Sequence, residues 1–169
     1  MALVPGPGGQ YLEPMEIGSP DPVRGSASRW HAALAHTADV GVRVMAPDPG
    51  GLLEEAAAAL SELSAEVGRA PEVRSRPVEA RGGDLSALVY AWLNDLVGLA
   101  EVLGEALVGA EVHRVEANPD GWIARGIATF AAYDGDRVRP RLQVKAATFH
   151  RMRVTHEPEG WALEAYFDV

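Results

Sequence analysis

Two stretches with a two-residue hydrophobic period lie near opposite ends of the chain. Val40, Val42 and Val44 alternate with polar or small residues, which is the pattern of a half-buried strand. Residues 160–169 alternate in the same way up to the last residue. Chain ends usually fray, so a strand pattern that reaches the terminal carboxylate indicates that this end is held within the fold.

Two other segments have helical periodicity. From Asp48, a predicted N-cap, to Gly68, apolar residues recur every three or four positions. Three glutamates of this segment are predicted to face water: Glu54, Glu55 and Glu62. The second segment, Leu85–Leu103, follows the predicted cap Asp84 and has the largest apolar stripe of the chain, with Trp92 as a core anchor. The two patterns predict two core-facing helices.

The remaining hydrophobic segments have strand patterns. Residues 73–81 predict an edge strand, because Pro77 lacks a backbone donor. Residues 108–117 and 122–133 flank the turn sequence Asn-Pro-Asp-Gly and predict a hairpin. Toward the end of the chain, residues 145–150 are followed by a hairpin-like continuation at 152–155, a turn at 158–160 and the final strand.

The composition is that of an ordinary soluble globular protein. Of the 169 residues, 47% are hydrophobic and 23% are charged, and the net charge is −9. Such an acidic body repels phosphate backbones, so stable nucleic-acid binding by the protein alone is not expected. Without cysteine there is no disulfide framework and no thiolate metal site. No membrane-length apolar run and no signal peptide are found, which predicts a cytoplasmic protein.

Residues 1–28 differ from the rest of the chain because they are rich in proline and glycine. A segment of this composition buries too little apolar surface to offset its ordering entropy. The sequence therefore predicts a disordered extension at residues 1–28 and one globular domain at residues 29–169.

Acidic groups lie just before the strand that begins at Val40 and at the end of the last strand. The two-residue period puts Asp39 on the face opposite the valines, where its carboxylate is available. Asp168 and the free carboxylate of Val169 place two anions at one point, which is unfavourable unless a cation or donors lie nearby. Taken alone, Asp39 is more often a turn or cap residue, and a solvated strand end explains Asp168 equally well.

Four motifs favour a functional role for these acidic groups: His36-Thr-Ala-Asp-Val-Gly41, Trp92-Leu-Asn-Asp95, Lys145-Ala-Ala-Thr-Phe-His150 and Phe167-Asp-Val169. In this order and spacing, the chain from His36 to Val169 resembles the archease family. The resemblance implies an α+β fold in which a mixed sheet packs with two helices, with a small strand-rich insertion at about residues 106–141. The third motif departs from the family pattern at Ala147 and Phe149, and the basic stretch Arg137–Arg141 precedes it where relatives often have a histidine.

The resemblance also implies a function. Archeases are protein cofactors of RtcB-type RNA ligases, which join RNA ends in tRNA splicing with GTP and divalent metal. The cofactor assists guanylylation of the ligase and repeated turnover, and is not itself a catalyst. Carried over residue by residue, the family's metal site falls on Asp39, Asp168 and the carboxylate of Val169. The candidate residues for activation of the ligase are Lys145, His36, Thr148 and His150.

Oxygen ligands of this kind suit hard divalent cations, with calcium expected in vitro and manganese or magnesium as alternatives. Two other function classes stay open. A metal-dependent hydrolase would use His36, Asp39, His150 and Asp168 around a metal-bound water, although no nucleophile motif or phosphate-binding glycine loop accompanies them. An interaction module without a metal would make the acidic strand ends incidental.

Overall fold

The computed structural model describes residues 4–5, 11–12, 28–35, 40–69 and 71–169. Its two helices are α1 (Pro49–Ser64) and α2 (Leu85–Leu103). The larger sheet has the strand order β10 (Ala146–Glu157), β11 (Gly160–Asp168), β4 (Val40–Ala46) and β3 (Trp30–Ala35). The second has the order β6 (Val73–Gly82), β8 (Gly121–Ala132) and β7 (Glu105–Asn118). Two short strands, β5 (Ala65–Val67) and β9 (Val138–Pro140), form a separate pair.

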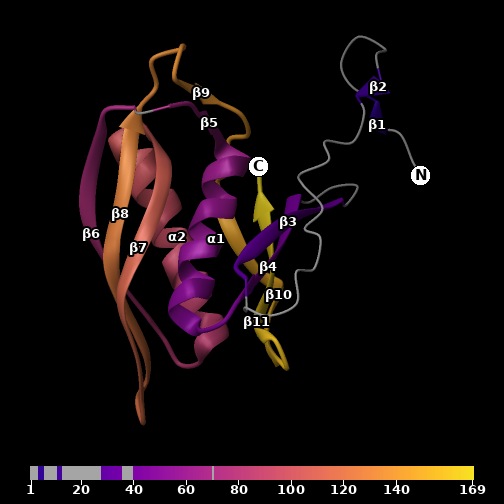
Figure 1. Ribbon diagram of the computed structural model, residues 1–169, viewed down its shortest axis with the longest axis vertical. Helices are drawn as coiled ribbons and strands as arrows, with labels where there is room; N and C mark the ends of the chain where they lie inside the picture. Colours follow the sequence, from indigo (N-terminus) through magenta and orange to yellow (C-terminus); the bar gives the residue numbers. More distant parts are fainter. Residues whose placement is uncertain (1–3, 6–10, 13–27, 36–39, 70) are drawn as a thin grey trace.

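The helices form a layer between the two larger sheets (Figure 1). This arrangement confirms the α+β fold with two helices. All strand pairs of the described residues are antiparallel, and they form separate sheets in place of a single mixed sheet. The separation into two sheets, one on each side of the helices, follows from the apolar face of α2. This helix buries five large side chains completely: Leu88, Val89, Trp92, Leu93 and Leu96. A face of that width needs cover from both sides.

The hydrophobicity of α2 has a second consequence. By length and composition this 19-residue helix is apolar enough to cross a membrane, which differs from the prediction that the chain has no membrane-length apolar run. In the structure, Trp92 is fully buried and its indole Nε1 donates to the Leu53 carbonyl oxygen over 3.2 Å. Packing between the sheets accounts for the buried side chains of α2, whereas Val102 near its C-terminus is 84% exposed.

The segment predicted as an insertion, about residues 106–141, packs into the main body. Leu107, Ala124 and Phe130 from β7 and β8 belong to the same buried cluster as the helices and β11. Pro77 lies in β6, which is an edge strand as predicted. The buried residues of β7 and β8 named above are therefore part of the central core, whereas Ala106, Ala131 and Val138 belong to a second, smaller cluster.

The local signals at the helix N-termini are confirmed. Asp48 Oδ1 accepts from the Gly51 amide over 2.8 Å, and Asp84 Oδ1 accepts from the Ala87 amide over 2.7 Å. The C-terminus of α1 was placed too late, because the helix ends at Ser64 and the residues before Gly68 form β5, which pairs with β9. Local periodicity cannot show that a partner strand far along the chain competes for these residues.

Of the three glutamates predicted to face water, Glu62 is exposed as predicted, whereas Glu54 and Glu55 are half-buried, and all three make tertiary contacts. Glu54 Oε1 accepts from the Val112 amide over 2.7 Å, and its other oxygen pairs with Arg29. Glu55 and Glu62 lie on either side of the His31 ring, at 2.6 Å from Nδ1 and 3.1 Å from Nε2. Glu62 itself remains largely exposed. These contacts fasten α1 to β3 and β7.

The segment after residue 150 also differs from its prediction. β10 is one strand whose register against β11 shifts between Thr148 and Arg153, so residues 152–155 continue the same strand. Arg151 lies in this bulge with a φ of 67°. The irregularity explains why the alternation of hydrophobic residues is broken here.

Most of the predicted extension lies outside the described residues. Within residues 1–28 the structure describes Ser28 and two short strands that pair with each other, β1 (Val4–Pro5) and β2 (Tyr11–Leu12). The disorder of this segment stays a prediction.

Candidate functional site

The last strand holds an interior place in the larger sheet. β11 pairs with β10 on one side and with β4 on the other, and Phe167 lies opposite both Ala147 and Val40. Phe167 is almost completely buried. The pairing confirms that strand structure continues to Asp168, and it brings the start of β10 beside the last residues.

Lys145 contacts those residues directly. Its Nζ donates to the main-chain oxygen of Val169 over 3.0 Å, and its backbone amide donates to the Asp168 carbonyl oxygen over 2.9 Å. Three of the predicted site residues, Lys145, Asp168 and Val169, are thus brought together. The ammonium group partly offsets the negative charge at the strand end, although solvent exposure weakens the attraction.

The acidic groups at this strand end are open to solvent. Asp168 is exposed, and Val169 is 44% exposed. Carboxylate oxygens at an open rim fit a hard cation that keeps part of its water shell. Within the described ranges, no three side chains of the metal-binding types His, Asp and Glu are grouped closely enough to hold an ion. The third predicted ligand, Asp39, and the candidate His36 lie outside the described residues.

Thr148 and His150 lie at the entry to the β10 bulge. The Thr148 hydroxyl Oγ1 is 3.2 Å from the Tyr166 carbonyl oxygen and 3.3 Å from that of His150, and it donates its single proton to one or the other. The His150 side chain is exposed. The contacts of Thr148 therefore show a role in fixing the backbone of the bulge against β11.

Tyr166 is a residue of this region that the sequence analysis did not single out. It pairs with Gly41, and a Cβ atom added to that glycine would lie 2.8 Å from Cε1 of the Tyr166 ring. The Arg151 guanidinium carbon lies 5.9 Å from the centroid of the same ring. A larger residue at position 41 would force the Tyr166 ring to shift, so the close approach of the ring favours glycine here.

Asn94 holds the start of β10 from the side of α2. Its Oδ1 accepts from the Ala147 amide over 3.1 Å, and its Nδ2 donates to the Ala147 carbonyl oxygen over 3.2 Å. The side-chain amide thus bonds Ala147 at the outer edge of the sheet as a neighbouring strand would. At the next residue, burial raises the pKa of Asp95. Asn94 lies within the motif Trp92-Leu-Asn-Asp95, but the sequence assigned it no role, and its contact with Ala147 is visible only in the structure.

A cavity of about 330 Å³ opens beside Lys145, between the C-terminal ends of the helices and the start of β7. Its wall includes Glu105, whose Oε1 pairs with Arg74 over 3.0 Å. Oε2 of Glu105 is buried without a hydrogen-bond partner among the described residues. The cavity and the candidate site therefore lie at the same end of the molecule.

Comparison with known proteins assigns the fold to a family. The model of the Archease protein family matches residues 31–169. The chain belongs to the archease family. It is 36% identical over 136 residues to protein archease of Methanopyrus kandleri, covering 80% of this chain and 96% of that protein. It is 33% identical over 147 residues to protein archease of Thermococcus gammatolerans, covering 83% and 99%.

A solved structure agrees with the archease assignment. The solution structure of Methanobacterium thermoautotrophicum protein 1598 superposes with a TM-score of 0.69 at 25% identity, covering 82% of this chain and 98% of that one. The archease membership inferred from the four motifs is therefore confirmed. Of the site residues that the archease resemblance assigns, the structure places Lys145, Thr148, His150, Asp168 and Val169 at one end of β10 and β11.

Proposed function

We propose that this archease is a metal-binding protein cofactor of an RtcB-type RNA ligase. It promotes guanylylation of the ligase and multiple turnover in tRNA splicing and RNA repair, and it joins no RNA by itself. The observation that carries the proposal is the contact of Lys145 with Val169, next to Asp168. This contact brings the candidate activating lysine and two candidate metal ligands to one open strand end.

The proposed metal ligands are the carboxylates of Asp39 and Asp168 and the terminal carboxylate of Val169. Calcium, manganese and magnesium are the cations that such oxygen ligands suit. A bound cation supplies a concentrated positive charge, and its remaining coordination positions are open to water or to a ligand from the partner. Lys145 holds the Val169 end in place through its hydrogen bond.

The proposed partner is a protein, because the acidic chain has little attraction for RNA alone. With a net charge of −9, the protein reaches RNA only through a partner that supplies positive charge. The proposed place of action is the cytoplasm, together with the ligase.

The test is RNA ligation by the cognate RtcB-type ligase at limiting ligase concentration, with and without this protein. The isolated protein should join no RNA, and its addition should raise the product beyond one equivalent per ligase. Equal product in both reactions would contradict the proposal. Turnover of a model phosphoester by the isolated protein would favour a metal-dependent hydrolase.

A further inference from the structure

An aromatic and basic surface surrounds the bulge of the edge strand β10. It consists of five solvent-facing residues, which we call the β10 patch: Tyr90, Phe149, His150, Arg151 and Arg153. Phe149 is 56% exposed, and Tyr90 of α2 is 36% exposed. An exposed aromatic side chain leaves apolar surface in contact with water, which is unfavourable unless a partner covers it. A pair of such side chains on one surface therefore indicates a contact site.

The bulge determines how these side chains are presented. The register of β10 against β11 is lost between Thr148 and Arg153, and Arg151 has a φ of 67°. For a residue with a Cβ atom this left-handed conformation is unfavourable. A bulge at a sheet edge turns side chains out of the regular alternation. Here it directs Phe149 toward α2 and Arg151 toward β11.

The aromatic pair is held in a defined geometry. The rings of Tyr90 and Phe149 meet edge to face, with centroids 5.3 Å apart and an interplanar angle of 89°. Asn94, one turn further along α2, fastens β10 through Ala147. An aromatic side chain fixed in this way loses little conformational entropy on binding, which is a property of interface anchors.

The charge of the segment differs from that of the whole protein. From Lys145 to Arg153 the chain carries Lys145, Arg151 and Arg153 and no acidic residue, whereas the net charge of the protein is −9. On the neighbouring strand β11, the acidic residue Glu164 lies opposite Arg153. Aromatic residues and arginine are enriched in the centres of protein–protein interfaces. The patch adjoins the candidate site, because His150 belongs to both and its carbonyl oxygen lies 3.3 Å from the Thr148 hydroxyl.

We propose that the β10 patch is the docking surface for the protein partner, and that the partner presents an acidic segment with an apolar side chain against Phe149. Phe149 and Tyr90 form the apolar anchor, and Arg151 and Arg153 attract the acidic groups. Docking there places Lys145 and Asp168 at the rim of the same interface. The identity of the partner as an RtcB-type ligase rests on the proposed function.

Two variants test the patch with the full chain and the cognate ligase. Phe149→Ser removes the anchor, and Arg153→Glu reverses one charge. Matched controls are Val102→Ser, which changes an 84% exposed hydrophobic residue of α2, and Arg69→Glu on an exposed loop. Binding to the ligase is measured by calorimetry, stimulation of ligation is measured over a range of cofactor concentrations, and thermal melting verifies the fold.

Each patch variant should weaken ligase binding about tenfold or more, which corresponds to roughly 1.4 kcal/mol. Each should raise the half-stimulating concentration by a similar factor, with stimulation recovering as its concentration is raised. The controls should match the wild type. Wild-type affinity in both patch variants would overturn the inference, as would tighter binding of Arg153→Glu.

The two readouts separate this inference from the proposed function. Patch-dependent binding without any stimulation would support the docking surface and contradict the cofactor role. Stimulation with binding that does not depend on the patch would support the cofactor role and contradict the docking surface. Fluorescence anisotropy with a labelled single-stranded RNA covers the remaining case, because RNA binding by the isolated protein that Phe149→Ser abolishes would assign the patch to RNA and overturn protein docking.

Discussion

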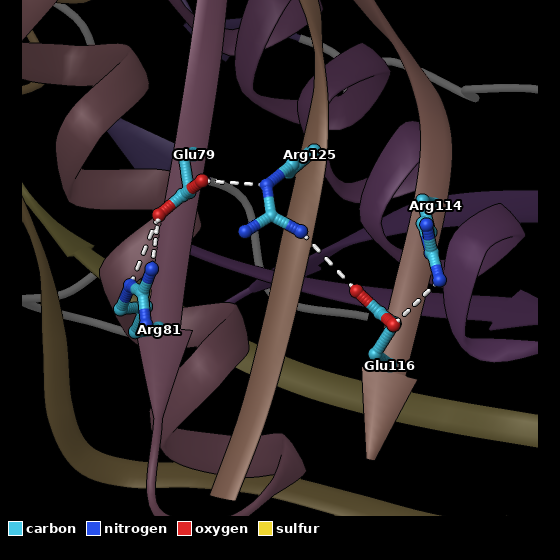
Figure 2. Close-up of polar contacts among 5 residues, drawn as sticks. All are labelled: Glu79, Arg81, Arg114, Glu116 and Arg125. Atoms are coloured by element: carbon cyan, nitrogen blue, oxygen red, sulfur yellow. Dashed lines mark hydrogen bonds and ion pairs between the residues drawn. The ribbon is translucent and has the colours of Figure 1, made fainter. Parts of the chain in front are cut away.

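Two surfaces of the protein carry charged residues in different ways. On the outer face of β6, β8 and β7, five side chains form one chain of alternating charge: Arg81, Glu79, Arg125, Glu116 and Arg114 (Figure 2). Their N···O distances run from 2.6 Å for Arg125 with Glu79 to 3.2 Å for Arg125 with Glu116. Hydrogen bonds from Arg81 and then from Arg125 hold the pKa of Glu79 below its usual range.

At the end of β10 and β11, by contrast, charged groups are exposed at a strand end. Lys145 meets the last residue, Asp168 is exposed, and the bulge beyond Thr148 presents aromatic and basic side chains. A surface whose charges satisfy one another has little left for a partner, whereas a strand end with clustered exposed anions favours a cation. We therefore propose a structural role for the first surface and a metal- and partner-binding role for the second.

The largest effect is expected from Asp168→Ala. The change removes a candidate metal ligand from an exposed position, so stimulation of the ligase should fall at least tenfold while the melting temperature stays close to the wild-type value. Ligation assays and thermal melting measure the two quantities. The matched control is Glu116→Ala in the ion-pair chain of Figure 2, which should leave stimulation intact. Equal stimulation by both variants would contradict the proposal that the end of β10 and β11, and not the ion-pair chain, carries the function.

Asn94→Ala should affect both stability and function. It leaves the amide and carbonyl groups of Ala147 without their side-chain partner, and Ala147 is only 2% exposed. An unsatisfied buried polar group costs about 1–3 kcal/mol, which denaturant unfolding can measure. Because the same bonds hold the segment that carries Lys145, maximal stimulation should also fall. A stability loss without any change in stimulation would show that Asn94 does not position the site.

The His31 contacts predict a stability change with pH. Burial alone lowers the pKa of His31, but hydrogen bonds to Glu55 and Glu62 outweigh it, and the pKa is raised. Protonated His31 therefore favours the folded state. This contribution is fully present below about pH 6.5, the unfolded-state value, and is lost as pH rises through the folded-state pKa. Melting curves from pH 5.5 to 8.5 should show this loss for the wild type and a smaller change for His31→Asn; parallel curves would count against it.

The smallest effect is expected from Arg125→Ala. Arg125 links Glu79 and Glu116 across the sheet, but the pairs are exposed, and salt screens such interactions. The melting temperature should change by about 2 °C or less, and stimulation of the ligase should not change. Melting at low and at high salt provides the measurement. A large loss of stimulation would show that the outer face of β6, β8 and β7 takes part in the function.

Much of the fold could be predicted because its signals are local. The caps Asp48 and Asp84 and the period of residues 85–103 predicted the helix starts and the full length of α2, and the Asn-Pro-Asp-Gly turn predicted the pairing of β7 with β8. The errors occurred where distant residues decide. The end of α1 depends on pairing with β9, and the glutamates of α1 meet Arg29, His31 and Val112.

For the candidate site, the sequence indicated which residues to consider but not their contacts, because those contacts join distant parts of the chain. The motifs gave Lys145, Asp168 and Val169 by family resemblance, and the structure adds that antiparallel pairing of β10 and β11 brings them into contact. Tyr166 and the bulge at Arg151 were missed, because their roles depend on the approach of the ring to Gly41 and on a register shift. The roles of all candidate site residues stay predictions, and Asp39 and His36 also lie outside the described residues.

The most direct measurement of the central claim is formation of the guanylylated ligase. Purified ligase is incubated with labelled GTP and divalent metal, alone, with the wild-type protein, or with Asp168→Ala. The cofactor role predicts that the wild type increases the rate of guanylylation, that Asp168→Ala does so weakly, and that no label is attached to this protein itself. Equal rates with and without the wild-type protein would contradict the assignment.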